Sequence, residues 1–313
     1  MICYYYLTYE CNCKCDYCPV WQDSDLDRSI VPSLDTLDQN LSSLKRLGIK
    51  EIFFTGGEPL LYEDLSRALQ LAKEKGFVVL LSTNGLLSSE RLSPASGTLD
   101  RLFISMSYPS EAEHNAAKAQ ECFLEAVDAI TLARHIGVEA VIDYVLTRDS
   151  IRFLPELIEL AQEKGAKVRL VPVHHCPDLE GFEEISFGYI QRYSRSPQVI
   201  FDRNLFNILR RGGNNISRPS CAVLNNSISI SPDNNLILPC IWSRQATIPI
   251  NGDLENIMSS DIVKGYKRLQ GTFDSCRGCV ALESVDRSFL GNIKSEDIPG
   301  KAIRAMFSFI RGR

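Results

Sequence analysis

The chain has 313 residues, of which 44% are hydrophobic, and its formal net charge is −5 at pH 7. This charge gives no support for a nucleic-acid partner or for binding to an anionic membrane surface. No uncharged apolar run reaches the roughly 18 residues that a membrane-spanning helix needs, and the N-terminus lacks a secretory signal pattern, so we expect a cytoplasmic protein with no membrane span.

Strand and helix signals alternate through the first half of the chain. Nearly continuous apolar runs predict strands at 2–9, 49–55, 77–82, 102–107, 140–146 and 168–173. Helical spacing of apolar residues predicts helices at 34–47, 65–75, 123–136 and 153–164, the first with Ser33 as its N-cap. Repeating units of about thirty residues with continuously apolar strands are typical of βαβ units, so the pattern predicts an α/β fold with parallel strands.

The second half of the chain has a weaker pattern. Residues 199–209 are predicted to be helical, and the segment 212–215 has the composition of a turn or linker. Two short apolar runs, 227–230 and 236–238, flank the polar turn 232–235 and predict a β-hairpin. A short basic and apolar helix is expected at 302–310.

Three of the eleven cysteines follow the first predicted strand at CxxxCxxC spacing, namely Cys11, Cys15 and Cys18. Cysteines grouped at ligand spacing in a chain without an export signal indicate metal binding in a reducing compartment. Thiolates are suited to iron–sulfur clusters, zinc and copper(I). Three thiolates on one loop can hold three corners of a cubane cluster and leave the fourth iron open to a ligand. A zinc loop completed by Cys13 is the alternative interpretation.

Two further motifs end the next two predicted strands. Gly56, Gly57 and Glu58 close the run Ile52-Phe53-Phe54, and Ser82-Thr83-Asn84-Gly85 closes the third strand. With the cysteine loop and its aromatic residue Tyr17, these motifs make the chain similar to the radical S-adenosylmethionine (SAM) enzymes. The motifs lie within residues 1–85, and the strand–helix repeat extends the resemblance to about residue 175.

The resemblance implies a fold and a set of cofactor contacts. The fold would be a partial (β/α)6 TIM-like barrel with a C-terminal β-hairpin plus helix extension that binds a cluster. Cys11, Cys15 and Cys18 would hold a [4Fe–4S] cluster, and the segment Gly56, Gly57, Glu58 would bind the amino group of SAM. Tyr17 would lie by the adenine, and further SAM contacts are expected from Ser82, Asn84, Ser105, Ser107 and Tyr144. The family often has Asp where this chain has Ser107, so the ribose contact departs from the usual pattern. The two glycines could alternatively form a turn, and Asn84 could cap a helix.

A second set of cysteines surrounds the predicted hairpin. Cys221 precedes it, Cys240 follows it, and Cys276 and Cys279 form a CxxC further along the chain. Spacing alone leaves a zinc ribbon and a four-cysteine cluster equally open. The arrangement resembles the twitch extension of some radical SAM enzymes, a shortened form of the SPASM domain. That resemblance implies one fully ligated auxiliary [4Fe–4S] cluster that transfers electrons.

The predicted domains are a radical SAM core at 1–175, a connecting helical segment at 176–218, an auxiliary cluster domain at 219–285 and a helical tail at 286–313. His174 and His175 end the sixth predicted strand, and one of them is the candidate catalytic base. A histidine in a surface loop, with no catalytic part, is the alternative.

The resemblance predicts an oxidoreductase. SAM is cleaved to a 5′-deoxyadenosyl radical, which takes a hydrogen from an unactivated C–H bond of a small-molecule substrate, and the auxiliary cluster assists the oxidation. The expected partners are that substrate and a reductant such as flavodoxin or ferredoxin, and the chain is expected to be a monomer. Tetrapyrrole side-chain modification and peptide maturation are alternatives, the latter disfavoured because no recognition segment precedes the first strand. A non-catalytic electron-transfer or sensor protein is the alternative from another class.

Overall fold

The computed structural model describes residues 1–173 and 184–281. Its strands belong to one ten-stranded sheet. They are β1 (Ile2–Thr8), β2 (Glu51–Gly56), β3 (Val78–Thr83), β4 (Arg101–Met106), β5 (Glu139–Leu146), β6 (Lys167–Pro172), β7 (Val199–Ile200), β8 (Ser227–Ile230), β9 (Asn235–Leu238) and β10 (Ala246–Pro249). Their order in the sheet is β10-β9-β8-β1-β2-β3-β4-β5-β6-β7.

Most of the sheet is parallel. Strands β1 to β7 lie side by side in chain order, and each pair is parallel. Strand β8 is parallel to β1 on its other side, and β9 and β10 continue the sheet antiparallel. Parallel neighbours need a crossover between them, which explains the helix after most of the strands.

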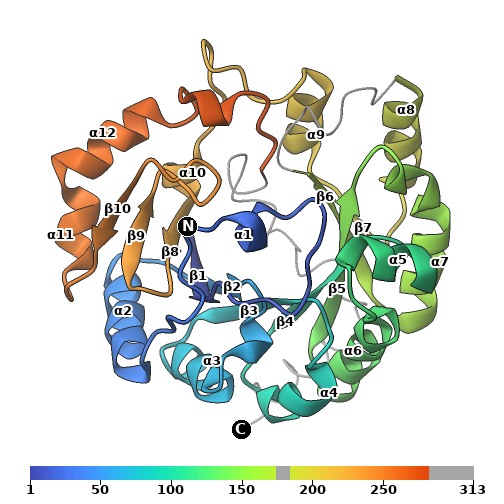
Figure 1. Ribbon diagram of the computed structural model, residues 1–313, viewed down its shortest axis with the longest axis horizontal. Coiled ribbons are helices and arrows are strands. Elements are labelled where there is room, and N and C mark those ends of the chain that lie inside the picture. Colours follow the sequence, from blue (N-terminus) through green and yellow to red (C-terminus); the bar gives the residue numbers. More distant parts are fainter. Residues whose placement is uncertain (174–183, 282–313) are drawn as a thin grey trace, which may run out of the picture.

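The α-helices of the described part are α1 (Pro19–Gln22), α2 (Leu34–Arg46), α3 (Leu65–Glu74), α4 (Ser88–Arg91), α5 (Glu111–Lys118), α6 (Phe123–His135), α7 (Leu154–Lys164), α8 (Glu184–Tyr193), α9 (Arg203–Arg210), α10 (Val223–Asn226), α11 (Leu254–Ser259) and α12 (Asp261–Leu269). Short 3₁₀ turns are η1 (Pro59–Leu61), η2 (Ser93–Ala95), η3 (Ser150–Phe153) and η5 (Asp274–Cys276). In Figure 1 the strands follow a curve, with α2, α3, α6 and α7 on its outer side and α1 within it.

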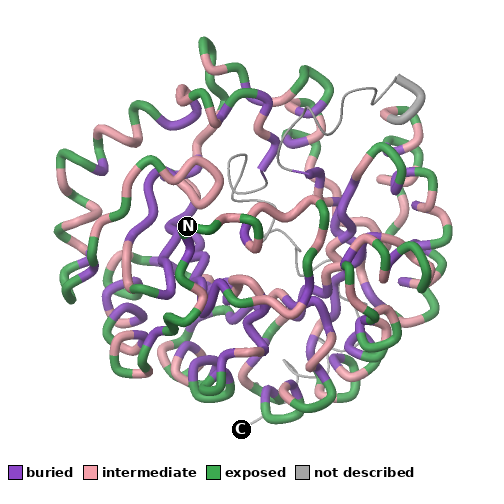
Figure 2. Tube along the Cα trace, viewed as in Figure 1, coloured by how far each residue is buried: buried purple, intermediate pink, exposed green. Residues whose placement is uncertain are grey.

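Both faces of the strands are buried, as the continuous apolar runs predicted. Side chains such as Tyr5 and Leu7 of β1 pack with the outer helices in the main core. The alternate residues Tyr4 and Tyr6 face the concave side, where they form a second cluster with Phe53, Phe103 and others. Figure 2 shows burial concentrated on the strands and on the inward surfaces of the helices.

The concave face also holds a buried ion pair. Arg169 of β6 donates through Nε to Oδ1 of Asp143 on β5 at 2.6 Å, and a second bond joins its Nη2 to Oδ2. The guanidinium lies 4.1 Å from the ring centroid of Phe103. This pair is 6% and 13% exposed, so it is a fixed polar element in an otherwise aromatic surface.

The sequence predictions hold for the main elements. The α/β class with a mostly parallel sheet is confirmed, and Ser33 caps α2 by accepting a bond from the amide of Thr36. The hairpin is confirmed as β8 and β9, whereas the helix predicted at 199–209 divides into β7 and α9. Strand β10 and helix α5 have no counterpart in the predictions, and no bounds were predicted for the helices α11 and α12 that follow the hairpin. The partial barrel and the four domain boundaries stay predictions, and helix 302–310 lies outside the described residues.

Candidate active site

The three cysteines of the CxxxCxxC motif lie on the loop between β1 and α1. Cys11, Cys15 and Cys18 are partly exposed and form no disulfide, whereas Cys13 is 1% exposed. The Cys13 thiol interacts with Cys122, and hydrogen bonding to Cys13 lowers the pKa of the Cys11 thiol. Cys13 therefore differs from the other three in burial, while it remains in hydrogen-bond contact with Cys11.

The cysteine loop rests on the end of β2 through its backbone. The amide of Gly57 donates to the carbonyl of Thr8 at 2.8 Å, and the amide of Glu58 donates to the carbonyl of Glu10 at the same distance. A Cβ atom at Gly56 would lie 2.2 Å from the Thr8 oxygen, and one at Gly57 would lie 2.1 Å from the Glu10 oxygen. Glycine is required at both positions because the backbone of the cysteine loop approaches so closely.

The Glu58 side chain is 1% exposed and joins the ends of β2 and β3. Its oxygens accept bonds from the amides of Leu60 and Asn84 at 3.0 and 2.7 Å, and from the Thr83 hydroxyl at 2.8 Å. Burial raises its pKa to about 7, although these three donors act in the opposite direction. The carboxylate is thus held by three internal donors, and its contact with the amino group of SAM stays a prediction.

Asn84 extends this connection to the cysteine loop. Its Nδ2 donates to Oδ1 of Asn12 at 2.7 Å, and its Oδ1 accepts a bond from the amide of Leu86 at 3.0 Å. Asn84 thus stabilises the turn after β3 and contacts the loop that carries the cysteines, while α4 begins after Leu87 without a side-chain cap. Its predicted contact with SAM stays a prediction. Ser82 lies two residues earlier, on the same side of β3 as Leu80, which faces the concave cluster.

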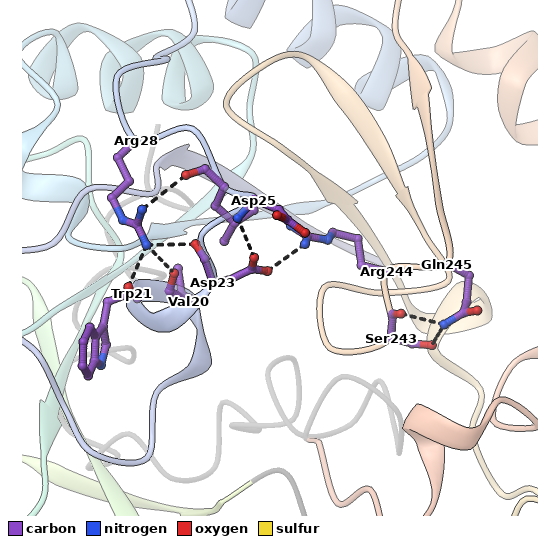
Figure 3. Close-up of polar contacts among 9 residues, drawn as sticks. Val20, Trp21, Asp23, Asp25, Arg28, Ser243, Arg244 and Gln245 are labelled. Atoms are coloured by element: carbon purple, nitrogen blue, oxygen red, sulfur yellow. Dashed lines mark hydrogen bonds and ion pairs between the residues drawn. The ribbon is translucent and has the colours of Figure 1, made fainter.

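The other side of the cysteine loop rests on the C-terminal end of α5. The amide of Lys14 donates to the carbonyl of Lys118 at 2.9 Å. Within the loop, Nε1 of Trp21 donates to the carbonyl of Cys15 at 2.6 Å. Arg28 donates to the carbonyls of Trp21 and Asp23 at 2.7 and 2.9 Å, and so holds the last turn of α1 in place (Figure 3).

Lys118 is a buried cation that sequence reasoning missed. It is 2% exposed, its Nζ donates to Oγ of Ser105 at 2.7 Å, and it lies 5.8 Å from the ring centroid of Tyr17. Tyr17 is in turn hydrogen-bonded to Oγ of Ser107 at 2.9 Å. Burial disfavours the ammonium, but interactions with Tyr17 and Cys15 outweigh it and raise the pKa of Lys118. Three predicted residues, Tyr17, Ser105 and Ser107, thus gather around an unpredicted one.

The remaining predicted residues lie elsewhere. Tyr144 is fully buried in the helix-side core, and its hydroxyl donates to the carbonyl of Ser150 at 2.6 Å. The structure does not bring it to the group around Lys118. His174 and His175 lie outside the described residues, so their predicted role as a base stays a prediction.

The second set of cysteines lines one cavity. Cys221, Cys240, Cys276 and Cys279 all contribute to it, together with Trp242. Asn214 organises this region, because its Nδ2 donates to the carbonyls of Gly271 and Cys276 at 2.8 and 3.0 Å. The sequence predicted that these four residues converge, and the structure brings them together from both ends of the hairpin and from η5.

Thiols can be ligands of a zinc ion or of a cubane iron–sulfur cluster. Among the described residues, no group of three or more His, Cys, Asp or Glu side chains is arranged to hold a single metal ion. A zinc ion would draw its sulfurs together because Zn–S bonds are about 2.3 Å long. A cubane binds one cysteine per iron and keeps its ligands further apart.

A family comparison matches this part of the chain. The model of the Radical SAM superfamily matches residues 5–173, which include the cysteine loop and strands β1 to β6. The chain belongs to the radical SAM superfamily. Members of this superfamily bind SAM and a [4Fe–4S] cluster.

Curated relatives cover several reactions. The PqqA peptide cyclase of Gluconobacter oxydans is 29% identical over 51% of this chain and 45% of that protein. The probable GTP 3′,8-cyclase of Sulfolobus acidocaldarius is 28% identical over 54% of each chain. The AdoMet-dependent heme synthase of Nitratidesulfovibrio vulgaris is 27% identical over 51% of this chain and 44% of that protein. This radical SAM chain spans about half the length of these relatives.

Solved structures share the fold of this radical SAM protein over most of its length. Streptococcus suis SuiB bound to the precursor peptide SuiA is 16% identical with a TM-score of 0.69, over 90% of this chain and 70% of that one. The structure of anSMEcpe with bound AdoMet and a Cp18Cys peptide is 16% identical with a TM-score of 0.62, over 88% and 83% of the two chains. Within the described residues, no helix has the length and apolar character that crossing a membrane requires.

The contact between Gly57 and the cysteine loop can be tested by adding one carbon. We expect Gly57→Ala to destabilise the protein by about 1–3 kcal/mol, because the backbone oxygen of Glu10 cannot move without displacing the loop. We also expect it to lower the iron bound per chain. Urea unfolding and iron analysis measure the two effects.

Gly265→Ala is the matched control, since nothing lies within 4 Å of a Cβ atom at Gly265 in α12. It should leave iron binding unchanged and alter the free energy of unfolding by less than about 1 kcal/mol. Equal stability and iron content in Gly57→Ala would contradict the assigned role of this contact.

Proposed function

We propose that this chain cleaves SAM reductively and uses the resulting radical to oxidise an unactivated C–H bond of its substrate. The observation that carries the proposal is the loop of three free thiols, Cys11, Cys15 and Cys18, held between the end of β2 and the buried Lys118. When bound, a cluster with three cysteine ligands supplies an open iron for SAM and the electron that cleaves it to methionine and a 5′-deoxyadenosyl radical.

The protein groups beside the loop suit that pair of cofactors. Thiolate ligands bring negative charge into a partly buried site, and the Lys118 ammonium offsets it. The Lys118 ammonium has three donors and hydrogen-bonds to Ser105 and Tyr17, so we assign its third donor to the carboxylate of SAM. Tyr17 and Ser107 stand next to it and are the groups we assign to the adenosine part.

The concave face gives the substrate a largely apolar setting. The cluster that includes Phe53 and Phe103 covers this face with aromatic side chains, which favours the exclusion of water from the reaction. His174 and His175 follow the end of β6 in the sequence, and one of them remains our candidate for the base that takes the substrate proton.

An auxiliary [4Fe–4S] cluster at Cys221, Cys240, Cys276 and Cys279 completes the proposal. Its support is the convergence of four thiols on one cavity. Such a cluster would accept the second electron of a two-electron oxidation, and flavodoxin or ferredoxin would supply electrons to the first one. The partial barrel, the twitch-like extension and the dehydrogenase type of reaction belong to this proposal.

Peptide maturation is the second candidate, and one observation favours it. The neighbours SuiB and anSMEcpe were solved with peptides bound, and one relative is the cyclase of the PqqA peptide. This weighs against the expectation of a small-molecule substrate, so the radical chemistry is proposed here independently of the substrate's size.

The central test is production of 5′-deoxyadenosine. Reconstituted anaerobically with iron and sulfide, the wild-type chain should form 5′-deoxyadenosine from SAM and dithionite, and Cys15→Ala should form none. Cys3→Ala is the matched control, because Cys3 is buried in the helix-side core away from the cysteine loop, and it should retain the product. Wild-type protein that binds zinc at this loop, or an iron centre whose spectrum does not respond to SAM, would overturn the proposal.

The proposed role of Lys118 predicts a specific kinetic change. Lys118→Met removes a charge-assisted hydrogen bond to the SAM carboxylate, so the KM for SAM should rise by roughly tenfold to one hundredfold. Lys264→Met, on exposed α12, should leave the KM unchanged. An unchanged KM in Lys118→Met would remove Lys118 from the SAM site, whatever happens to iron content.

Iron counting separates the two interpretations of the second cysteine set. If both sets of cysteines hold a cubane cluster, the reconstituted chain should contain about eight irons, and Cys276→Ala should reduce this number to about four. A zinc ribbon instead predicts about four irons and one zinc in the wild-type chain. Because the first cluster has its own loop, Cys276→Ala should still form 5′-deoxyadenosine from SAM.

A further inference from the structure

An open groove lies between the segment after the cysteine loop and the hairpin strands. It has a volume of about 360 Å³. One wall comes from residues 25–30, which follow α1, and the other comes from the turn after β8 and from strands β9 and β10. The proposed cofactor contacts use none of the residues that line it.

The groove is strongly acidic. Asp25, Asp27 and Asp233 line it, and the cation in its lining is Arg244. Arg244 already pairs with Asp23 at 2.7 Å, so its charge is largely compensated (Figure 3). The Asp25 side chain has no hydrogen-bond partner among the described residues, whereas Asp27 accepts bonds from Ser29 and Asp233 accepts one from Ser231. The groove therefore attracts a positively charged group.

The side chain of Tyr9 also lines the groove. Tyr9 is 5% exposed, and no group in the described part of the chain hydrogen-bonds to its hydroxyl. A ligand with a hydrogen-bond donor would give this oxygen a partner.

Apolar residues line the groove next to these charges. Leu26 and Ile30 lie on the loop side, and Ile237 and Ala246 lie on the strand side. A compact ammonium group has three donors and no acceptor, which suits carboxylates and a phenol oxygen, and a chain of methylene groups suits the apolar strip. Neither a neutral sugar nor an anion has this combination of properties.

We propose that this groove binds a primary ammonium group on a short alkyl stem and that the substrate carries this group. The inference rests on the proposed radical chemistry only in naming the ligand as a substrate. The groove wall continues from the cysteine loop, and the Asp23–Arg244 pair joins that wall to the segment after Cys240. A ligand held there is therefore anchored beside the loop that carries the proposed cluster.

The test is calorimetric titration of the reconstituted full chain, in the absence of SAM, with 1-aminopentane and with the uncharged 1-pentanol. We expect one saturable site for the amine and binding at least tenfold weaker for the alcohol. Asp25→Asn and Tyr9→Phe, which keep the shape of the groove, should each weaken amine binding by roughly tenfold. Asp128→Asn, an exposed residue on α6, is the matched control and should bind like wild type.

A second pair of probes identifies the source of the amine. If the peptide acetyl-Gly-Lys-Gly-amide binds more tightly than 1-aminopentane, and acetylation of its lysine abolishes this binding, the ligand is a lysine side chain. If 1-aminopentane binds more tightly, the ligand is a small amine. Equal binding of amine and alcohol, equal weakening by Asp128→Asn, or no binding would overturn the inference. Formation of 5′-deoxyadenosine is measured separately. If the protein cleaves SAM but binds no amine, the inference about the groove is refuted and the proposed radical chemistry is not.

Discussion

The arrangement of the site depends on a backbone contact between the ends of β1 and β2. Gly56 and Gly57 lack side chains where a Cβ atom would overlap the carbonyls of Thr8 and Glu10. Two amide-to-carbonyl bonds at 2.8 Å then hold the start of the cysteine loop in place. The same segment ends in Glu58, whose buried carboxylate connects β2 to the turn after β3. The loop is thereby positioned by strand ends, which are among the most rigid parts of an α/β fold.

Charge on the concave side of the sheet is sparse and compensated. The Lys118 ammonium lies by the thiol loop, and the Asp143–Arg169 pair lies among aromatic side chains. Isolated charges cannot remain in such a place without a partner, because desolvation costs several kcal/mol per ion. Lys118 forms one bond to Ser105, and a ligand with a carboxylate would complete its environment.

The C-terminal hairpin continues the sheet that carries the cysteine loop. Because β8 pairs with β1 along four residues, the segments that hold the second set of cysteines lie beside the first strand of the core. The acidic groove arises at the same junction, between the segment after α1 and strands β9 and β10. Both cysteine sets and the groove thus involve segments next to β1 and the hairpin strands.

The sequence by itself determined the strand–helix order, the parallel sheet and the family, because apolar periodicity and the cysteine and glycine motifs are local patterns. It also selected Tyr17, Ser105 and Ser107, which the structure brings together. It could not reveal Lys118, since no local pattern marks a lysine thirteen residues after Ser105 as buried. Nor could it reveal that three internal donors hold the Glu58 carboxylate. Only the tertiary structure decided these points, because burial and charge pairing arise from contacts between segments far apart in the chain.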